Sequence, residues 1–162
     1  MKIFLGSDHA GFKIKEELKS FLIEGGHDVT DFGAHELKVD DDFPDYVIPV
    51  AKAVAANALA RGIVVGGSGQ GEAICANRIK GIRAVVYYGR EKRSDLSSDP
   101  RSDLGMIEFT REHNDANILS LGARFLDVDD AKNAVSKWIS TEFSKDERHI
   151  RRLSKIDDLS KR

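Results

Sequence analysis

Short apolar runs that end at or near glycine alternate with longer amphipathic stretches, and this alternation limits the possible folds more than any other feature of the sequence. A short apolar run bounded by turn residues is typical of a buried strand, whereas apolar residues at steps of three and four indicate one face of a helix. Strands that alternate with helices form a mostly parallel sheet with helices on both faces. The predicted strands are Lys2–Gly6, His27–Phe32, Ile63–Val65, Ala84–Tyr88 and Asn117–Leu121.

Amphipathic stretches follow most of these runs, so we expect an α/β, three-layer, Rossmann-like fold with a five-stranded parallel sheet flanked by helices. Gly25 and Gly26 end the first helix. In such sheets, ligands bind beyond the carboxyl ends of the strands, where the strand order switches. The predicted helices are Phe12–Leu22, Asp45–Ala60, Glu72–Asn77 and Val128–Phe143.

Two stretches depart from this pattern within what we expect to be a single domain, residues 1–162. Residues 90–103 are rich in charge and include Ser97-Ser98-Asp99-Pro100, so they are a surface insertion or an active-site lid. Residues 145–162 form an amphipathic helix that we expect to dock on a partner subunit. Its apolar residues are Ile150, Leu153, Ile156 and Leu159.

Composition excludes several classes of function. The chain has 162 residues, with 25 Lys and Arg against 27 Asp and Glu, so no general positive field attracts nucleic acid. No apolar run approaches the roughly 18–20 residues of a membrane span, and the first run turns polar at Ser7, too early for a signal peptide. We therefore expect a cytoplasmic protein with no membrane or nucleic-acid partner. One cysteine excludes an internal disulfide and a cysteine-rich zinc site.

The first group of polar residues follows the first predicted strand, as Ser7-Asp8-His9-Ala10-Gly11. Gly6 and Gly11 have the spacing of a phosphate-binding P-loop, but Phe12-Lys13 stands where that motif needs Lys-Ser or Lys-Thr. An Asp-His pair at the end of a strand can contact a ligand. In the alternative interpretation, Asp8 is a helix N-cap and His9 a surface residue.

The second group is the glycine-rich segment Gly66–Gly71, followed by Glu72. Glycine lets backbone N–H groups approach a ligand closely, which suits a phosphate or the oxyanion of an enediolate. A dinucleotide-binding motif has a different spacing and follows the first strand rather than the third. Glu72 could move a proton beside such an oxyanion, or could simply occupy the first turn of a helix.

Three further candidates are weaker when each is taken alone. His113 and the neighbouring Asn114 could exchange protons with a hydroxyl group, or could belong to an ordinary turn. Arg148 and Arg152 lie four residues apart on the predicted last helix, so together they suit a phosphate dianion or form a solvated basic face. Cys75 lies in an apolar helical segment and is interpreted as an inert thiol.

Taken together and in this order, these elements resemble the type B ribose-5-phosphate isomerases, a family that also includes galactose-6-phosphate isomerase subunits. The resemblance spans nearly the whole chain, and its motifs form a specific set. The matching segments are residues 6–11, 42–46, 66–72, 76–78, 81–84, 113–115, 121–124 and 148–152.

The resemblance implies an aldose–ketose isomerase that moves a proton between C2 and C1 through a cis-enediolate, without metal or cofactor. One branch of the family uses a cysteine base at the position of Gly66, and the other a glutamate at the position of Glu72. Since glycine cannot accept a proton, Glu72 is the implied base. The family builds each site from two subunits, which implies a homodimer and leaves a tetramer open.

The family's remaining roles carry over by position. The backbone at Gly67, Ser68, Gly69 and Gly71 would form the anion hole. His113 would assist ring opening, and Asp8 and Asn114 would contact the sugar, with Tyr46 nearby. The residues implied to hold the phosphate are His9, Arg124, Arg148 and Arg152.

The sequence departs from the family in one place. Between Val86 and His113 lie 26 residues, more than family members usually have there, and the surplus is the charged segment 90–103. Ribose-5-phosphate is the expected substrate. Allose-6-phosphate, galactose-6-phosphate or a tetrose phosphate would fit the same chemistry, and a non-catalytic sugar-phosphate sensor is the alternative from a different class.

Overall fold

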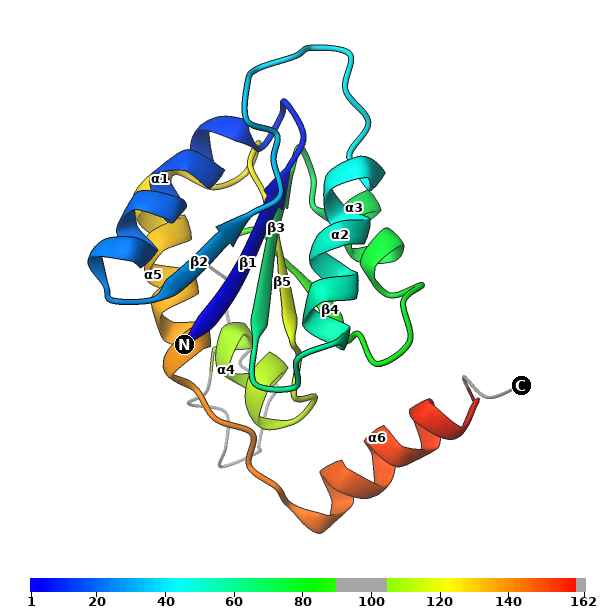
Figure 1. The fold of residues 1–162 in the computed structure, drawn as a ribbon. Coiled ribbons are helices and arrows are strands. Elements are labelled where there is room, and N and C mark those ends of the chain that lie inside the picture. The colour runs from blue at the N-terminus through cyan, green and yellow to red at the C-terminus, as the bar shows by residue number, and fades with distance from the viewer. Residues whose placement is uncertain (90–104, 160–162) are drawn as a thin grey trace.

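In a computed structural model, which describes residues 1–89 and 105–159, the chain forms an all-parallel sheet of five strands with helices on both faces (Figure 1). The strand order is β2-β1-β3-β5-β4. This confirms the predicted α/β fold class. The strands are β1 (Lys2–Ser7), β2 (Asp28–Asp31), β3 (Arg61–Gly66), β4 (Ala84–Tyr87) and β5 (Ile118–Gly122).

The helices form two layers. The helices α1 and α5 pack together on one face of the sheet, and α2 and α3 pack together on the other (Figure 1). The described helices are α1 (Phe12–Glu24), α2 (Pro44–Ala55), α3 (Gln70–Ala76), α4 (Met106–Glu112), α5 (Val128–Ser140) and α6 (Glu147–Leu159).

The core follows from the two-residue period of the strands, because successive side chains point to opposite faces of a sheet. Ile3 and Leu5 of β1 face α1 and α5, whereas Phe4 between them faces α2. The central strand β3 repeats this pattern, with Ile63 and Val65 on the first face and Val64 on the second. Both faces are therefore apolar, which explains the nearly continuous apolar runs in the sequence.

Two helices end earlier than predicted. The helix predicted over Asp45–Ala60 ends at Ala55, because the backbone N–H of Leu59 donates to the Asn57 side chain in a turn that leads into β3. The helix predicted over Val128–Phe143 ends at Ser140, where the hydroxyl of Thr141 donates to the carbonyl of Lys137. At both ends a short polar side chain bonds the backbone where the chain leaves the helix.

The sequence prediction missed α4. It is only seven residues long, and its buried positions include the polar residues Thr110 and Arg111, so its apolar periodicity is weak. Arg111 is buried because its guanidinium donates to the side chain of Asp115 and to the carbonyl of Ala116. The predicted insertion, residues 90–103, lies outside the described residues.

The predicted C-terminal helix exists as α6, which extends away from the sheet at the end where the strands begin (Figure 1). Only His149 of its first turn is buried, whereas Ile150 and Ile156 are exposed. The docking of this helix on a partner subunit stays a prediction.

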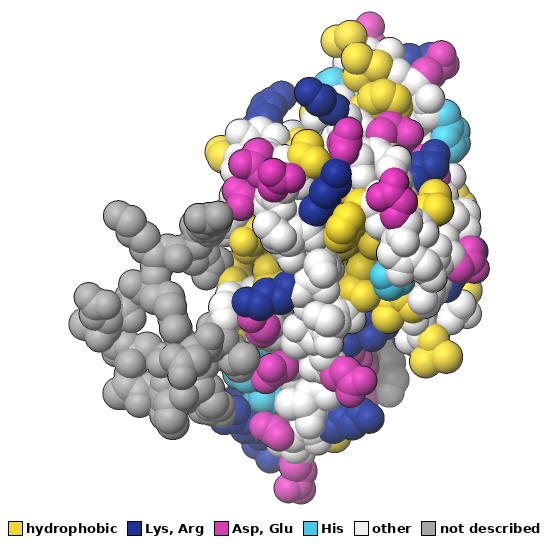
Figure 2. Space-filling view, turned by 90° about the vertical axis from the view of Figure 1, so that its left-hand side faces the viewer, with side chains coloured by type: hydrophobic (Ala, Val, Ile, Leu, Met, Phe, Trp, Pro, Cys, Tyr) yellow, Lys and Arg dark blue, Asp and Glu magenta, His cyan; other side chains and the backbone are white. Residues whose placement is uncertain are grey.

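The surface carries both signs of charge. On the face covered by α1 and α5, acidic and basic side chains are interspersed (Figure 2), and Lys132 pairs with Glu17 across the two helices at 2.9 Å. Within the part of the chain that the structure describes, none of the helices is both long enough and apolar enough to cross a membrane.

Candidate active site

Several of the predicted site residues, Glu72 and Asp8 among them, gather where the strand order switches. The chain passes from β1 outward to β2 and then returns to β3 on the other side of β1, so the loops after β1 and β3 leave toward opposite faces of the sheet. Parallel sheets bind ligands in the crevice that this divergence leaves at the carboxyl ends of the strands. Asp8 and His9 follow β1, and the segment from Gly67 to Glu72 follows β3.

Glu72 lies in the first turn of α3 and is only 4% exposed. Its carboxylate lies against the end of β3, in the space that a Cβ atom on Gly66 would fill. Burial raises the pKa of Glu72, and the negative charge of Asp8 raises it further. A hydrogen bond from its own backbone N–H opposes part of this rise, and the result is a buried carboxyl group with an increased affinity for a proton, as general bases often have.

The glycine-rich loop between β3 and α3 is anchored to the sheet. Gly69 has a left-handed backbone with φ of +72°, which a side chain would strain. The hydroxyl of Ser120 in β5 donates to the carbonyl of Gly69 at 2.7 Å, and the Ser68 hydroxyl accepts from the N–H of Gln70 at 3.3 Å. The loop that contains Gly67, Ser68, Gly69 and Gly71 therefore has a fixed course directly beside Glu72.

Asp8 lies opposite this loop and is 8% exposed. One of its carboxylate oxygens accepts the backbone N–H groups of Ala10 and Gly11, at 3.0 and 3.2 Å. Gly11, not Asp8, is the N-cap of α1, so the alternative interpretation of Asp8 as an N-cap is wrong. The carboxylate instead fixes the turn before the helix, and its charge acts on Glu72.

His9, Arg124 and Tyr46 surround the same end of the sheet. Arg124 follows β5, where its backbone N–H donates to the carbonyl of Gly67 at 3.1 Å, and its charge acts on His9. The guanidinium lies 3.2 Å from the position of a Cβ atom on Gly67, so it lies directly over the glycine-rich loop. Tyr46, in the first turn of α2, packs its ring against Gly33.

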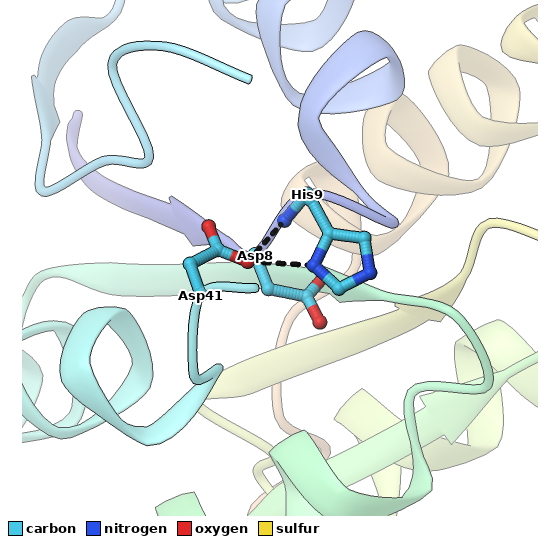
Figure 3. Close-up of side chains that lie close together, drawn as sticks. All are labelled: Asp8, His9 and Asp41. Carbon is cyan, nitrogen blue, oxygen red and sulfur yellow. Dashed lines mark hydrogen bonds and ion pairs between the residues drawn. The ribbon is translucent and has the colours of Figure 1, made fainter. Parts of the chain in front are cut away.

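Asp41, which the sequence analysis did not select, joins this group (Figure 3). One oxygen of its carboxylate accepts the backbone N–H of His9 at 3.0 Å and bonds the ring nitrogen Nδ1 of His9 at 2.6 Å. Its side chain is 6% exposed. The only sequence signal was the acidic run Asp40-Asp41-Asp42, which does not indicate which of the three carboxylates turns inward.

Asp8, His9 and Asp41 offer oxygen and nitrogen atoms within 4.8 Å of one another, which is the spacing of metal ligands. One oxygen of Asp41 bonds His9 and one oxygen of Asp8 accepts two backbone N–H groups, so hydrogen bonds within the chain already hold these three side chains. The cluster is therefore explained as an internal hydrogen-bonded network (Figure 3).

The other predicted site residues lie at the opposite end of the sheet, where the strands begin. His113 is the C-cap of α4, and Asn114 follows it in the turn before β5 begins. The ring of His113 stacks on that of His149 with centroids 4.2 Å apart, which places the start of α6 beside it. Arg148 and Arg152 belong to that helix. None of these four residues lies near Glu72 within the single chain.

His149 was not predicted as a site residue, and it is 1% exposed although the residues around it are charged. Its ring nitrogen Nδ1 lies 2.9 Å from the hydroxyl oxygen of Ser144, and its ring packs against the ring of His113. A histidine within a run of arginines gives no sequence signal of burial.

Known proteins resemble this chain over nearly its whole length. The family model described as Ribose/Galactose Isomerase matches residues 3–98 and 101–156. The chain belongs to the ribose/galactose isomerase family. The resemblance inferred from the motifs is therefore confirmed, and the family match includes both groups of site residues, those beside Glu72 and those beside His113.

Two relatives within this isomerase family show the extent of the similarity. Ribose-5-phosphate isomerase B of Mycolicibacterium paratuberculosis is 36% identical over 153 residues, which cover 94% of this chain and 87% of the relative. The enzyme of the same name from Escherichia coli is 35% identical over 161 residues, which cover 99% of this chain and 97% of the relative.

Solved structures of family members have the same fold. Ribose-5-phosphate isomerase B of Clostridium thermocellum is 40% identical with a TM-score of 0.85, covering 99% of this chain and 98% of that one. The Mycoplasma genitalium enzyme, solved with bound ribulose-5-phosphate, is 28% identical with a TM-score of 0.85, covering 99% of this chain and 96% of that one.

Proposed function

We propose that this protein interconverts ribose-5-phosphate and ribulose-5-phosphate, with Glu72 as the base. The buried carboxylate of Glu72, beside the glycine-rich loop, carries this proposal. Family membership supports the reaction class, and relatives at 35–36% identity bear the name of that enzyme.

The reaction requires proton transfers on the open-chain sugar. The Glu72 carboxylate removes the proton from C2 of the aldose, and the electron pair moves to O1, which gives a cis-enediolate. The same group then delivers the proton to C1 while a hydroxyl proton passes from O2 to O1, which yields the ketose. The raised pKa of Glu72 brings its basicity closer to what this exchange needs at neutral pH.

The glycine-rich loop would stabilise the negative charge that develops on the enediolate. Backbone N–H groups of Gly67, Ser68, Gly69 and Gly71 are the donors, and the anchored course of the loop fixes them before the substrate arrives. Asp8 would bind sugar hydroxyls from the opposite side, with Tyr46 near the sugar.

A complete site would need a second copy of the chain. His113, which would open the sugar ring, and Asn114 precede the first residue of β5. Glu72, in contrast, follows the last residue of β3, at the other end of the sheet. We therefore propose a homodimer in which each site combines Glu72 of one subunit with His113 of the other. Arg148 and Arg152 of α6 would then hold the phosphate together with His9 and Arg124.

The central test is Glu72→Gln, which preserves the size of the side chain and removes the base. We expect substrate binding to persist while kcat for ribose-5-phosphate falls by at least about 1000-fold, since both proton transfers use this group. Cys75→Ser, a change in the same helix, is the matched control and should retain activity. An active Glu72→Gln enzyme would contradict the assignment of the base.

Two measurements address the alternatives. Comparing kcat/KM for aldose phosphates of four, five and six carbons separates ribose-5-phosphate from allose-6-phosphate, galactose-6-phosphate or a tetrose phosphate. Deuterium uptake at C1 of ribulose-5-phosphate in deuterated water separates an enzyme from a sugar-phosphate sensor, because a pure binding protein exchanges no carbon-bound proton.

A further inference from the structure

We propose that Asp41 is a positioning residue for His9. It bonds ring nitrogen Nδ1 of His9 and thereby orients the other ring nitrogen, Nε2, to bind the substrate phosphate. This inference rests on the proposed function only in naming the phosphate as the ligand of His9. The contacts between Asp41 and His9 stand independently of it.

The first observation is that one oxygen of Asp41 bonds both the backbone and the side chain of His9. The backbone N–H of His9 donates to Oδ1 at 3.0 Å, and ring nitrogen Nδ1 lies 2.6 Å from the same oxygen. These two bonds fix the position of the residue and the rotation of its ring. Figure 3 shows the second ring nitrogen, Nε2, pointing away from Asp41.

The second observation is the burial of Asp41 within an otherwise exposed acidic segment. Its side chain is 6% exposed, whereas the neighbouring residues Asp40 and Asp42 are exposed. A buried carboxylate needs partners that favour its charge. Burial alone would raise the pKa of Asp41, but the hydrogen bonds from His9 lower it below the ordinary value, and the nearby Tyr46 hydroxyl acts in the same direction.

The charges around His9 act in both directions. The hydrogen bond with Asp41 raises the pKa of His9, burial opposes this, the charge of Asp8 also raises it, and Arg124 lowers it. Lys38 and Tyr46 act on the other side of Asp41. The pKa of His9 is raised in total, so Asp41 outweighs the nearby arginine.

The chemistry of imidazole gives this arrangement its consequence. A neutral ring that donates from Nδ1 to Asp41 presents only a lone pair at Nε2, which repels a phosphate oxygen. A protonated ring presents an N–H donor at Nε2 together with a positive charge. Asp41 therefore keeps His9 in the form that binds a phosphate dianion, beside Arg124.

The test compares Asp41→Asn with Asp40→Asn, which removes an exposed acid one residue away. In Asp41→Asn we expect the pKa of His9, followed by NMR of its ring, to fall below that of the wild type. We expect KM for ribose-5-phosphate at pH 8 to rise on the order of 10-fold, with kcat changed less than about threefold. At a pH below the His9 pKa that NMR measures in both proteins, where the ring is protonated in each, KM should approach the wild-type value.

A double-mutant cycle shows whether Asp41 acts through His9. In the His9→Gln background, Asp41→Asn should have almost no further effect on KM. Equal effects of Asp40→Asn and Asp41→Asn, or an unchanged His9 titration in Asp41→Asn, would overturn the proposal.

Two readouts do not depend on catalysis or on the stability of the variant. The wild-type His9 must titrate above the ordinary value of 6.5, and inorganic phosphate must raise its pKa further. If the protein does not isomerise ribose-5-phosphate, the proposed function fails while these titrations still test the role of Asp41. A wild-type His9 that titrates at or below the ordinary value would refute that role.

Discussion

The carboxylate of Glu72 lies in the space that a side chain on Gly66 would occupy. Gly66 ends β3, and Glu72 lies six residues later in the first turn of the short helix α3, so the loop between them returns the acid to the end of the strand. The family resemblance places the alternative cysteine base at the position of Gly66. In this chain the two bases would need the same volume, so the presence of Glu72 there requires glycine at the end of the strand.

We therefore predict that Gly66→Ala displaces the Glu72 carboxylate. A misplacement of about 1 Å costs on the order of 100-fold in rate, so kcat should fall by at least that factor. Overpacking should also lower the free energy of unfolding by about 1–3 kcal/mol. In a Glu72→Ala background the same change should cost at least about 1 kcal/mol less, because the clashing atoms are gone. Equal costs in both backgrounds, measured by urea unfolding, would show that the two side chains do not compete.

The pH dependence of activity should reflect the pKa of Glu72. As a base it must be ionised, so kcat/KM should fall as the pH decreases through a pKa above the ordinary 4.5. Asp8→Asn removes the neighbouring charge, which lowers the pKa of Glu72 and moves this acid limb to lower pH, whatever the loss in absolute rate. An acid limb that does not move would show that Asp8 has no electrostatic effect on the base.

The same pKa has a consequence for stability. A carboxyl group with a raised pKa in the folded state contributes stability below its unfolded pKa, and that contribution is lost as the pH rises through the folded pKa. As the pH rises from acidic to neutral, the unfolding free energy of Glu72→Gln should therefore increase relative to that of the wild type. Denaturant titrations of both proteins at several pH values measure this difference.

Mixing of inactive subunits tests the proposed sharing of sites. Glu72→Gln and His113→Asn are each expected to be nearly inactive. Random hybrids would regain roughly a quarter of wild-type activity, because half of the dimers are hybrid and each hybrid has one intact site. Glu72→Gln mixed with Asp8→Asn is the matched control, since both residues come from the same chain and no site is restored. No recovery in the first mixture would contradict a site shared between Glu72 and His113.

A further prediction concerns the buried ion pair between α1 and β2. Lys15 is fully buried and bonds Asp31 at 2.7 Å. Burial alone would raise the pKa of Asp31, but Lys15 and Lys19 lower it. Asp31→Asn removes this partner while Lys15 keeps its ion pair with Glu16, so the free energy of unfolding should fall by about 1.5–3 kcal/mol, as for the loss of a hydrogen bond to a charged group.

The exposed pair between Lys2 and Asp28 provides the control, because Asp28→Asn should cost less than about 1 kcal/mol. Since the folded pKa of Asp31 is lowered, the stability it contributes is present above its unfolded pKa and is lost as the pH falls through the folded pKa. The gap between wild type and Asp31→Asn in urea unfolding should therefore narrow in acid. A gap that is constant with pH would show that the ion pair contributes no net stability.

The strands could be predicted from the sequence because each buried run is apolar on both faces of the sheet. Ile63-Val64-Val65 illustrates this, with its residues divided between the two cores. The helix α4 could not be predicted in the same way, since Arg111 is buried through hydrogen bonds to Asp115 and Ala116, which a periodicity of apolar residues does not record.

The chemistry of the site was predictable where a residue type is unusual for its position, as with a glutamate directly after a glycine-rich loop. It was not predictable where the neighbours are alike. Asp40, Asp41 and Asp42 are the same residue type, and only the path of the loop decides that the middle one bonds His9. His149 was missed for a similar reason, because its burial depends on the position of α6 beside His113.

The separation of His113 from Glu72 within one chain is set by the length of a strand and not by the conformation of a loop. The five residues of β5 span about 16 Å, so no local rearrangement of a single subunit could join the two groups. Under the proposed shared site, dilution below the dissociation constant would leave mostly monomers, each with a base but no ring-opening histidine. The rate would then fall with the square of the protein concentration. The abundance of the protein in the cell would therefore determine the fraction of chains that are active as well as their number.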